Sequence, residues 1–201
     1  LAGDYSAQTA ITSSTEKTIT QAEVTADGTA ATNIALDDGD LVINGVAIQS
    51  SSSLDDTASN ASATSHVASS GIAIAAAINR SSDQTGVNAT ANATEAVGTS
   101  TQGAAADTTG ALIINGVTMT ALVSVGDLEK DKTAAISAIN DISGQTGVVA
   151  TDNGESLTLT AADGRNITVT AADDSGLAAF GLGGTGGGVD TEAGTTYSTV
   201  T

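Results

Sequence analysis

The chain has 201 residues and a formal net charge of -18, from 23 acidic and 5 basic residues. It has no cysteine, which excludes disulfides and thiolate metal sites, and no apolar run as long as a membrane span. The shortage of Lys and Arg disfavours binding to nucleic acid or to an anionic membrane surface, because these residues supply most of the attraction in both cases.

Aromatic residues make up only 1% of the chain, so the core must be built from Val, Ile, Leu and Ala. Because Phe, Tyr and Trp bury the largest areas per residue, we expect small, shallow cores in place of one deep core. The first residues show neither an initiator Met nor a signal-peptide pattern. We therefore expect this chain to be a piece excised from a longer protein.

Residues 1–37 contain candidate strands around Asp27-Gly28 and are expected to form an N-terminal β segment that joins the first unit. The first clear signal follows, where Asn44-Gly45 separates Leu41–Ile43 from Val46–Ile48. Asn-Gly between β-branched runs predicts a type I′ hairpin, because that turn needs positive φ at both central residues. By strand alternation, every second residue of this hairpin should face the same side.

The stretch from Ser50 to His66 is polar enough to predict an exposed loop. An Ala-rich segment comes next, in which Ile74 and Ile78 lie four residues apart, as on one face of a helix. Gly86 should end this helix, since glycine most easily adopts the positive φ found after a helix C-terminus. We expect a strand to begin immediately after it.

The same features recur further along the chain. Leu112–Val117 reads LIINGV, where Leu41–Val46 reads LVINGV. Ala77–Asn92 and Ala138–Asn153 are identical at eleven of sixteen positions. Agreement at two places in the same order indicates a duplicated unit.

The second copy again predicts a helix, with Ile136, Ile139 and Ile142 forming an apolar stripe before Gly147. It continues with Leu157–Ala171, in which Leu, Ile and Val alternate with Thr on both sides of Asp163-Gly164. This alternation predicts two strands joined as a second hairpin.

One unit thus reads hairpin–helix–strand–hairpin, and we place the two units at residues 38–106 and 107–175. In the first copy, Ala93 to Asp107 lacks the alternation, so that copy is either degenerate at its end or borrows strands from elsewhere. Residues 176–201 are predicted to be a Gly-rich C-terminal connector. The predicted class is α+β and β-rich, with short helices packed on antiparallel sheets.

The two copies resemble the flagellin-IN repeat, found in the central variable region of many bacterial flagellins and in some hook-associated proteins. The resemblance covers roughly Asp38 to Ala172 and depends on the combination of INGV, AIN, QTGV and DGRNI in order. In that family the terminal segments form long helices that polymerise, while the central region projects outward. This chain has no long heptad-bearing helix at either end, so the resemblance implies the outer domains alone.

The residues that could take part in catalysis or dinucleotide binding are better explained by structural roles. The one histidine, His66, lies in a polar loop without a spaced triad or metal partner, so we expect it to be solvated. Gly181, Gly183 and Gly186 match Gly-x-Gly-x-x-Gly, but no apolar helix follows them as dinucleotide binding requires, which favours a linker. No catalytic, cofactor-binding or metal-binding residue is nominated, and no enzyme activity is expected.

Acidic residues cluster at residues 37–40, at Asp55-Asp56 and at Asp173-Asp174. Calcium is the sensible ion for such oxygens, but none of the clusters fits a twelve-residue calcium loop, so solvated turns are favoured. Asn-x-Ser/Thr sequons, which arise readily in a Thr-rich chain, occur at Asn60, Asn88, Asn92 and Asn166. If the chain is a flagellin, O-linked glycans on surface Ser/Thr are the more expected modification.

The leading hypothesis is therefore a structural, extracellular module of the flagellar filament. Its expected partners are neighbouring flagellin subunits, with no nucleic acid and no membrane, and the isolated fragment should be monomeric. The alternative is a domain of a hook-associated or filament cap protein, or of a related surface adhesin, because the repeat is shared with such proteins. The near absence of aromatics counts against a glycan-binding adhesin.

Overall fold

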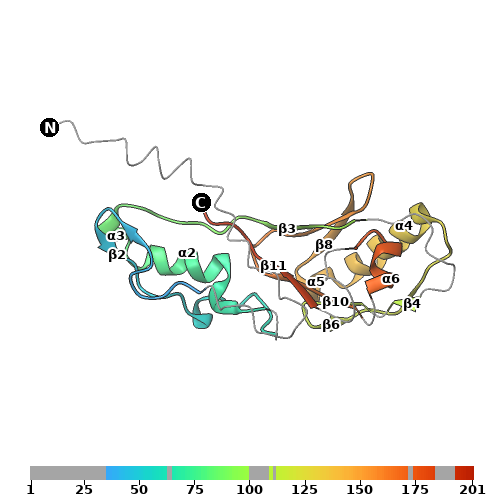
Figure 1. Cartoon of the computed structure of the whole chain (residues 1–201), viewed down its shortest axis with the longest axis horizontal. Coiled ribbons are helices and arrows are strands. Elements are labelled where there is room, and N and C mark those ends of the chain that lie inside the picture. The colour runs from blue at the N-terminus through green and yellow to red at the C-terminus, as the bar shows by residue number, and fades with distance from the viewer. Residues whose placement is uncertain (1–34, 63–64, 100–108, 111, 172–173, 184–192) are drawn as a thin grey trace.

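The structure is a computed structural model that describes residues 35–62, 65–99, 109–110, 112–171, 174–183 and 193–201. It combines helices with antiparallel sheets, which confirms the predicted α+β class. The molecule is elongated, with α2 and β2 at one end and α4, α6 and β4 at the other (Figure 1). We call residues 35–92 the first lobe and the described residues 94–198 the second lobe. Most of the N-terminal β segment expected in residues 1–37 lies outside the described residues.

The first lobe contains one hairpin and a group of short helices. Its elements are β1 (Val42–Ile43), β2 (Val46–Ala47), the 3-10 helices η1 (Ser53–Asp55) and η2 (Val67–Ser69), α2 (Gly71–Asn79) and α3 (Ser82–Thr85). β1 and β2 pair through Ile43↔Val46, so the Asn-Gly hairpin is confirmed. Ile43 and Ile48 are buried while Val42 is exposed, as the alternation predicts.

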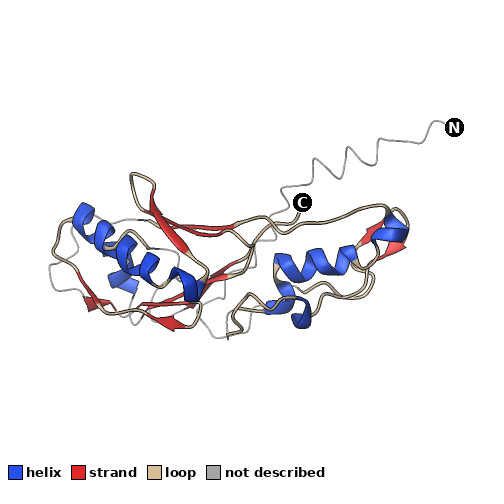
Figure 2. Cartoon of the chain, turned by 180° about the vertical axis from the view of Figure 1, so that it is seen from behind, coloured by secondary structure: helices blue, strands red, loops and turns tan. Residues whose placement is uncertain are grey.

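The second lobe holds three antiparallel sheets with helices packed on them (Figure 2). Its strands are β3 (Thr94–Val97), β4 (Thr109–Gly110), β5 (Leu112–Ile114), β6 (Val117–Thr118), β7 (Leu122–Val123), β8 (Val149–Asp152), β9 (Leu157–Ala161), β10 (Ile167–Ala171) and β11 (Ala193–Thr196). Its helices are α4 (Leu128–Asp141), α5 (Ser143–Thr146) and α6 (Asp174–Ala179). The strand orders are β11-β10-β5-β6, β3-β9-β8 and β4-β7. β5 and β6 form the second predicted Asn-Gly hairpin.

The two main helices begin at side-chain caps and end earlier than predicted. Ser70 Oγ accepts a hydrogen bond from Ala73 N–H at the start of α2, and Asp127 caps α4 in the same way. Both helices stop six or seven residues before Gly86 and Gly147, and the four-residue helices α3 and α5 fill the gap. Each glycine then adopts the left-handed conformation, with φ 71° and ψ 12°, as predicted for these positions.

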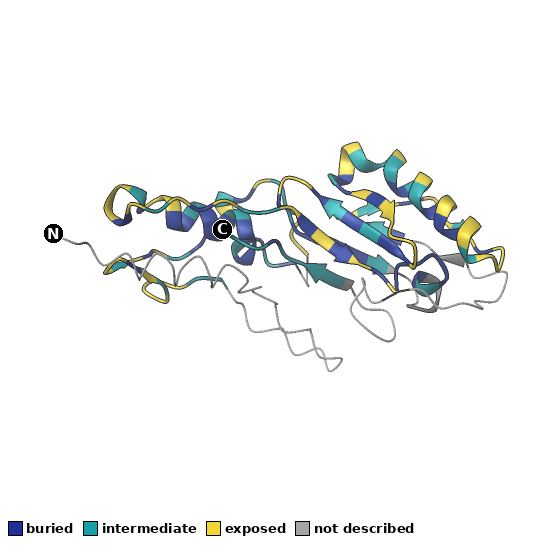
Figure 3. Ribbon diagram, turned by 90° about the horizontal axis from the view of Figure 1, so that it is seen from above, coloured by how far each residue is buried: buried dark blue, intermediate teal, exposed yellow. Residues whose placement is uncertain are grey.

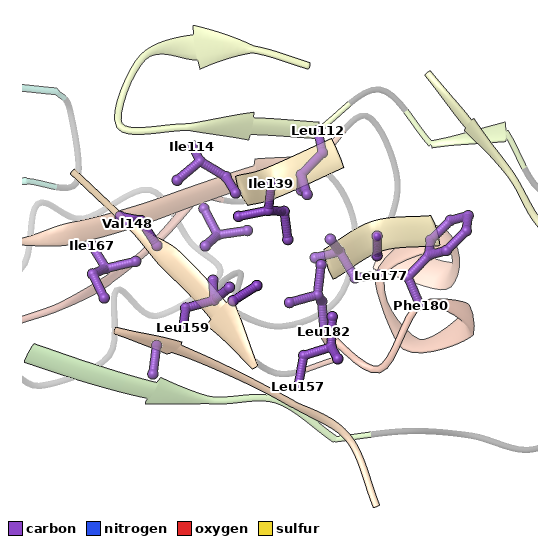
Figure 4. Packing of buried hydrophobic residues seen from close by; sticks show 14 of the residues in the cluster. Leu112, Ile114, Ile139, Val148, Leu157, Leu159, Ile167, Leu177, Phe180 and Leu182 are labelled. Carbon is purple, nitrogen blue, oxygen red and sulfur yellow. The ribbon is translucent and has the colours of Figure 1, made fainter. Parts of the chain in front are cut away.

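The apolar side chains form two separate cores, as the shortage of aromatics predicts. The smaller core lies in the first lobe and is built around α2 and the hairpin. The larger fills the second lobe, where Ile139 from α4 packs toward Leu112 and Ile114, and Leu159 lies on the facing sheet (Figure 4). One face of α4 is accordingly buried and the other exposed (Figure 3).

The hairpin predicted within Leu157–Ala171 is wrong in its pairing, although its two strands, β9 and β10, are correctly placed. β9 pairs with β8 and β3, whereas β10 pairs with β5 and β11. The edge of β9 that β10 would occupy is taken by β3, whose buried and exposed residues alternate as in a half-buried strand. The chain therefore passes from one sheet to another at Asp163-Gly164.

Residues 93–107 and 176–201 also differ from the predictions. β3 (Thr94–Val97) shows that the first range does contain a strand, and it pairs in the second lobe. In the second range, α6 and the buried residues Leu177, Phe180 and Leu182 belong to the larger core, so the connector prediction is wrong for them. The final residues Thr199–Thr201 pair with Thr90–Asn92 of the first lobe. These contacts form an isolated bridge at Ala91 and Val200, outside any named strand, beside the segment that follows α3.

Candidate functional site: duplicated asparagine contacts and an acidic surface

The asparagine of each Asn-Gly turn makes the same long-range contact. Asn44 and Asn115 have φ of 51° and 48°, the only positive values for non-glycine residues in the described chain. Asn44 Nδ2 donates to Thr85 O at 2.8 Å, and Asn115 Nδ2 donates to Thr146 O at 2.9 Å. Each turn is thereby tied to the last residue of the short helix α3 or α5, whose carbonyl has no partner within that helix.

A second pair of asparagines, at the ends of α2 and α4, binds the backbone of the following segment. Asn140 Oδ1 accepts from Ala150 N–H at 2.8 Å, and its Nδ2 donates to Ala150 O at 3.1 Å. Asn79 makes the same two bonds to Ala89, at 2.7 and 2.8 Å. In each case one side-chain amide satisfies both polar groups of one backbone residue, as a neighbouring strand would.

This contact closes a sheet edge in the second lobe. β8 is the outer strand of its sheet, and an outer strand presents unpaired N–H and C=O groups that invite pairing with another chain. Ala150 is on β8, and Asn140 occupies its outward-facing groups. Val148 N–H, just before the strand, is bound by Thr146 Oγ1 at 3.1 Å. Within β8, the Asn140 side chain therefore takes the place of a neighbour strand at Ala150.

The stretch from Ser50 to His66, predicted to be an exposed loop, instead joins the two lobes. Asn166 N–H donates to Ser59 Oγ at 2.9 Å, and Asn166 Nδ2 donates to Ser65 Oγ at 3.2 Å. Ser65 and Asn166 are both buried. Tyr197 accepts a hydrogen bond from the backbone N–H of His66 at 2.9 Å. Sequence polarity missed this role, because the hydrogen-bond partners of these residues lie about a hundred residues away.

The four basic residues that the structure describes are all in ion pairs. Their nitrogen-to-oxygen distances are Arg80–Asp55 2.7 Å, Lys130–Asp127 2.9 Å, Lys132–Glu129 2.8 Å, Lys132–Asp152 3.1 Å and Arg165–Asp163 2.6 Å. Lys132 is buried to 1% exposure, and its hydrogen bonds to Glu129 and then Asp152 raise its pKa above the ordinary value. The remaining carboxylates, such as Asp83 and Asp141, leave a surface of predominantly negative potential.

Several of the described acidic residues considered for calcium bind backbone N–H groups, and Asp55 binds the side chain of Arg80. Asp38 accepts from Ser50 N–H at 2.7 Å, and Asp40 accepts from Asp37 N–H at 3.1 Å. Asp56 accepts from two N–H groups just beyond it. Within the described ranges, no group of three or more His, Cys, Asp or Glu side chains could hold a metal ion. Asp173 lies outside the described residues.

The remaining candidates have structural positions. His66 is half-buried at the start of η2, so it is not the fully solvated side chain expected from its polar sequence context. Gly181, with φ 74°, follows α6, where its N–H binds Ala178 O and Leu182 N–H binds Leu177 O. These two bonds form a Schellman cap, which explains this glycine without a nucleotide. Gly186 lies outside the described residues.

No family model matches the chain, and no curated protein matches it either. Among the helices of the described residues, none combines the length and apolarity needed to cross a membrane.

Proposed function

We propose that the chain forms the outward-facing variable domains of a bacterial flagellin, with two flagellin-IN-like units at residues 38–106 and 107–175. The observation that carries the proposal is the repeated asparagine geometry. The INGV and AIN…QTGV residues that suggest the repeat are the ones that make equivalent hydrogen bonds in both lobes. A shared ancestor of the two copies explains both the sequence and this geometry.

The two proposed units are not two complete copies of the predicted hairpin–helix–strand–hairpin pattern. The segment Thr90–Asn92 of the first copy pairs with Thr199–Thr201 through backbone hydrogen bonds, and β3 joins the sheet of the second copy. Together with the contacts of Asn166, these exchanges tie the two units into one rod. An elongated shape suits a domain that has to project from a filament wall.

The proposed role is structural and not catalytic, and it takes place outside the cell. Filament subunits sit at very high local concentration, so their outer surfaces must not associate through apolar patches or open sheet edges. At such concentrations, the like charges on neighbouring copies repel one another. The acidic surface and the Asn140 contact at the β8 edge serve this purpose, and neighbouring flagellin subunits are the proposed partners.

The sequence left open a hook-associated or cap protein domain, or an adhesin. An adhesin that stacks on sugars needs exposed aromatic faces. Of the two aromatic residues within the described part of the chain, Phe180 is buried and Tyr197 is half-buried, with its hydroxyl bonded to His66. This favours the flagellin proposal over the adhesin.

A deletion in the parent gene tests the proposal. Removing residues 35–201 should leave a protein that is exported and still assembles, into a thinner filament visible by electron microscopy. The unmodified parent is the control for filament diameter, and an immunoblot of the culture medium checks export. Normal export of the shortened protein with no filament would contradict the proposal, since it would make this region necessary for assembly.

A further inference from the structure

We propose that Asn44 is a site of spontaneous deamidation and isoaspartate formation, while Asn115, in an identical sequence, is protected by the fold. Both residues lie in the tetrapeptide Ile-Asn-Gly-Val. The effect of neighbouring side chains on the chemistry is therefore the same at both, and any difference in rate must come from the folded structure.

The chemistry needs only water. The backbone nitrogen of Gly45 attacks Cγ of Asn44, the new C–N bond closes a five-membered succinimide, and the Cγ–Nδ2 bond breaks. Nδ2 leaves as ammonia and carries away the proton lost by the glycine nitrogen. Water then opens either carbonyl of the ring, giving aspartate or isoaspartate. Asparagine is among the thermolabile residues for this reason, and glycine as the next residue offers the least steric hindrance to the attack.

The side-chain amide of Asn115 is held more firmly than that of Asn44. Asn115 Nδ2 donates to Thr146 O at 2.9 Å, its Oδ1 accepts from Thr168 N–H at 2.8 Å, and its own N–H donates to Thr168 O at 2.9 Å. Asn44 has the counterpart of the first bond alone, to Thr85 O, and is exposed. Closure of the ring requires the amide to leave its partners, so Asn115 has more bonds to break.

The surroundings of the two glycines and of the two hairpins also favour faster reaction at Asn44. Gly45 has open space where a side chain would project, whereas a Cβ on Gly116 would collide with the side chain of Asn60. The hairpin of Asn44 is a two-stranded sheet at one end of the molecule (Figure 1), while that of Asn115 belongs to a four-stranded sheet. Short, solvent-exposed elements open locally at low free-energy cost, and the attack needs such an opening.

A third Asn-Gly pair, Asn153-Gly154, lies in the β8–β9 turn. Asn153 Oδ1 accepts from Glu155 N–H and Ser156 N–H, and its Nδ2 donates to Ser156 Oγ and Thr158 Oγ1. Although exposed, this side chain is held by hydrogen bonds to three following residues and is expected to react slowly. Conversion of Asn44 would add a negative charge to the tip and abolish the bond to Thr85 O, because a carboxylate cannot donate.

Incubation of the full chain at mildly alkaline pH, followed by proteolysis and mass spectrometry, tests the proposal. Asn44 should convert to aspartate and isoaspartate at least about ten-fold faster than Asn115, since two further hydrogen bonds have to break at Asn115. In denaturant the two sites should convert at equal rates. Equal native rates, faster conversion at Asn115 or Asn153, or a rate difference that persists in denaturant would overturn the proposal.

Discussion

Replacing Asn140 with alanine should destabilise the second lobe by about 1–3 kcal/mol. The substitution removes both hydrogen bonds to Ala150, at 2.8 and 3.1 Å. Ala150 is 2% exposed, so its N–H and C=O would lose their partners in a place that water reaches poorly. Each bond contributes about 1 kcal/mol net, and a buried group left without a partner costs about 1–3 kcal/mol. Asn79→Ala should behave similarly in the first lobe, through Ala89.

Urea unfolding followed by far-ultraviolet circular dichroism measures this change, since the chain has no tryptophan. The midpoint should fall while the slope with urea stays the same, because the surface exposed on unfolding is unchanged. Asn88→Ala is the matched control, an exposed asparagine whose replacement should shift the free energy of unfolding by less than about 0.5 kcal/mol. If Asn140→Ala behaves like Asn88→Ala, the Asn140 side chain neither stabilises β8 nor closes its edge.

Three further predictions concern packing, pH and association. Ile139→Ala should cost about 2–4 kcal/mol in the same titration, because Ile139 is fully buried in the larger core; a loss below about 0.5 kcal/mol would mean that the α4 face is misassigned. The pKa of Lys132 is raised above 10.5 by its bonds to Glu129 and Asp152, so its contribution is complete below pH 10.5 and is lost as the pH rises through the folded value. The pKa of Asp152 is lowered below 3.8 by the Gly154 N–H and by Lys132, so its contribution is present above pH 3.8 and is lost as the pH falls through the folded value. Thermal melts should show both losses, and Lys132→Met should reduce the alkaline one without removing it, because Asp127 also raises the pKa of Lys130. Sedimentation should find a monomer at low salt, and any dimer should strengthen as salt screens the charge of -18; a dimer that weakens with salt would contradict this.

Local sequence signals were sufficient where the structure depends on a single turn. Asn44-Gly45 and Asn115-Gly116 form the predicted hairpins, and Gly86 and Gly147 take the left-handed conformation. In each case the backbone needs a positive φ that few other residues tolerate, so the residue type identifies the conformation.

Pairing between distant segments could not be predicted in the same way. The alternation in β9 and β10 located both strands, but it does not say which neighbour each strand takes. β9 pairs with β3, and β10 pairs with β11, and neither partner strand lies close by in the sequence. Similarly, the Ser-rich loop appeared solvated because its partner Asn166 is about a hundred residues away.

The most direct test of the central proposal is to locate this region on intact bacteria. An antibody raised against the chain should, by immunogold electron microscopy, label the flagellar filament along its whole length and leave the cell body unlabelled. A strain lacking the parent gene is the control for the antibody. Label confined to the filament tip or to the hook junction would contradict the flagellin assignment in favour of a cap or hook-associated protein, and label on the cell body alone would contradict a flagellar role altogether.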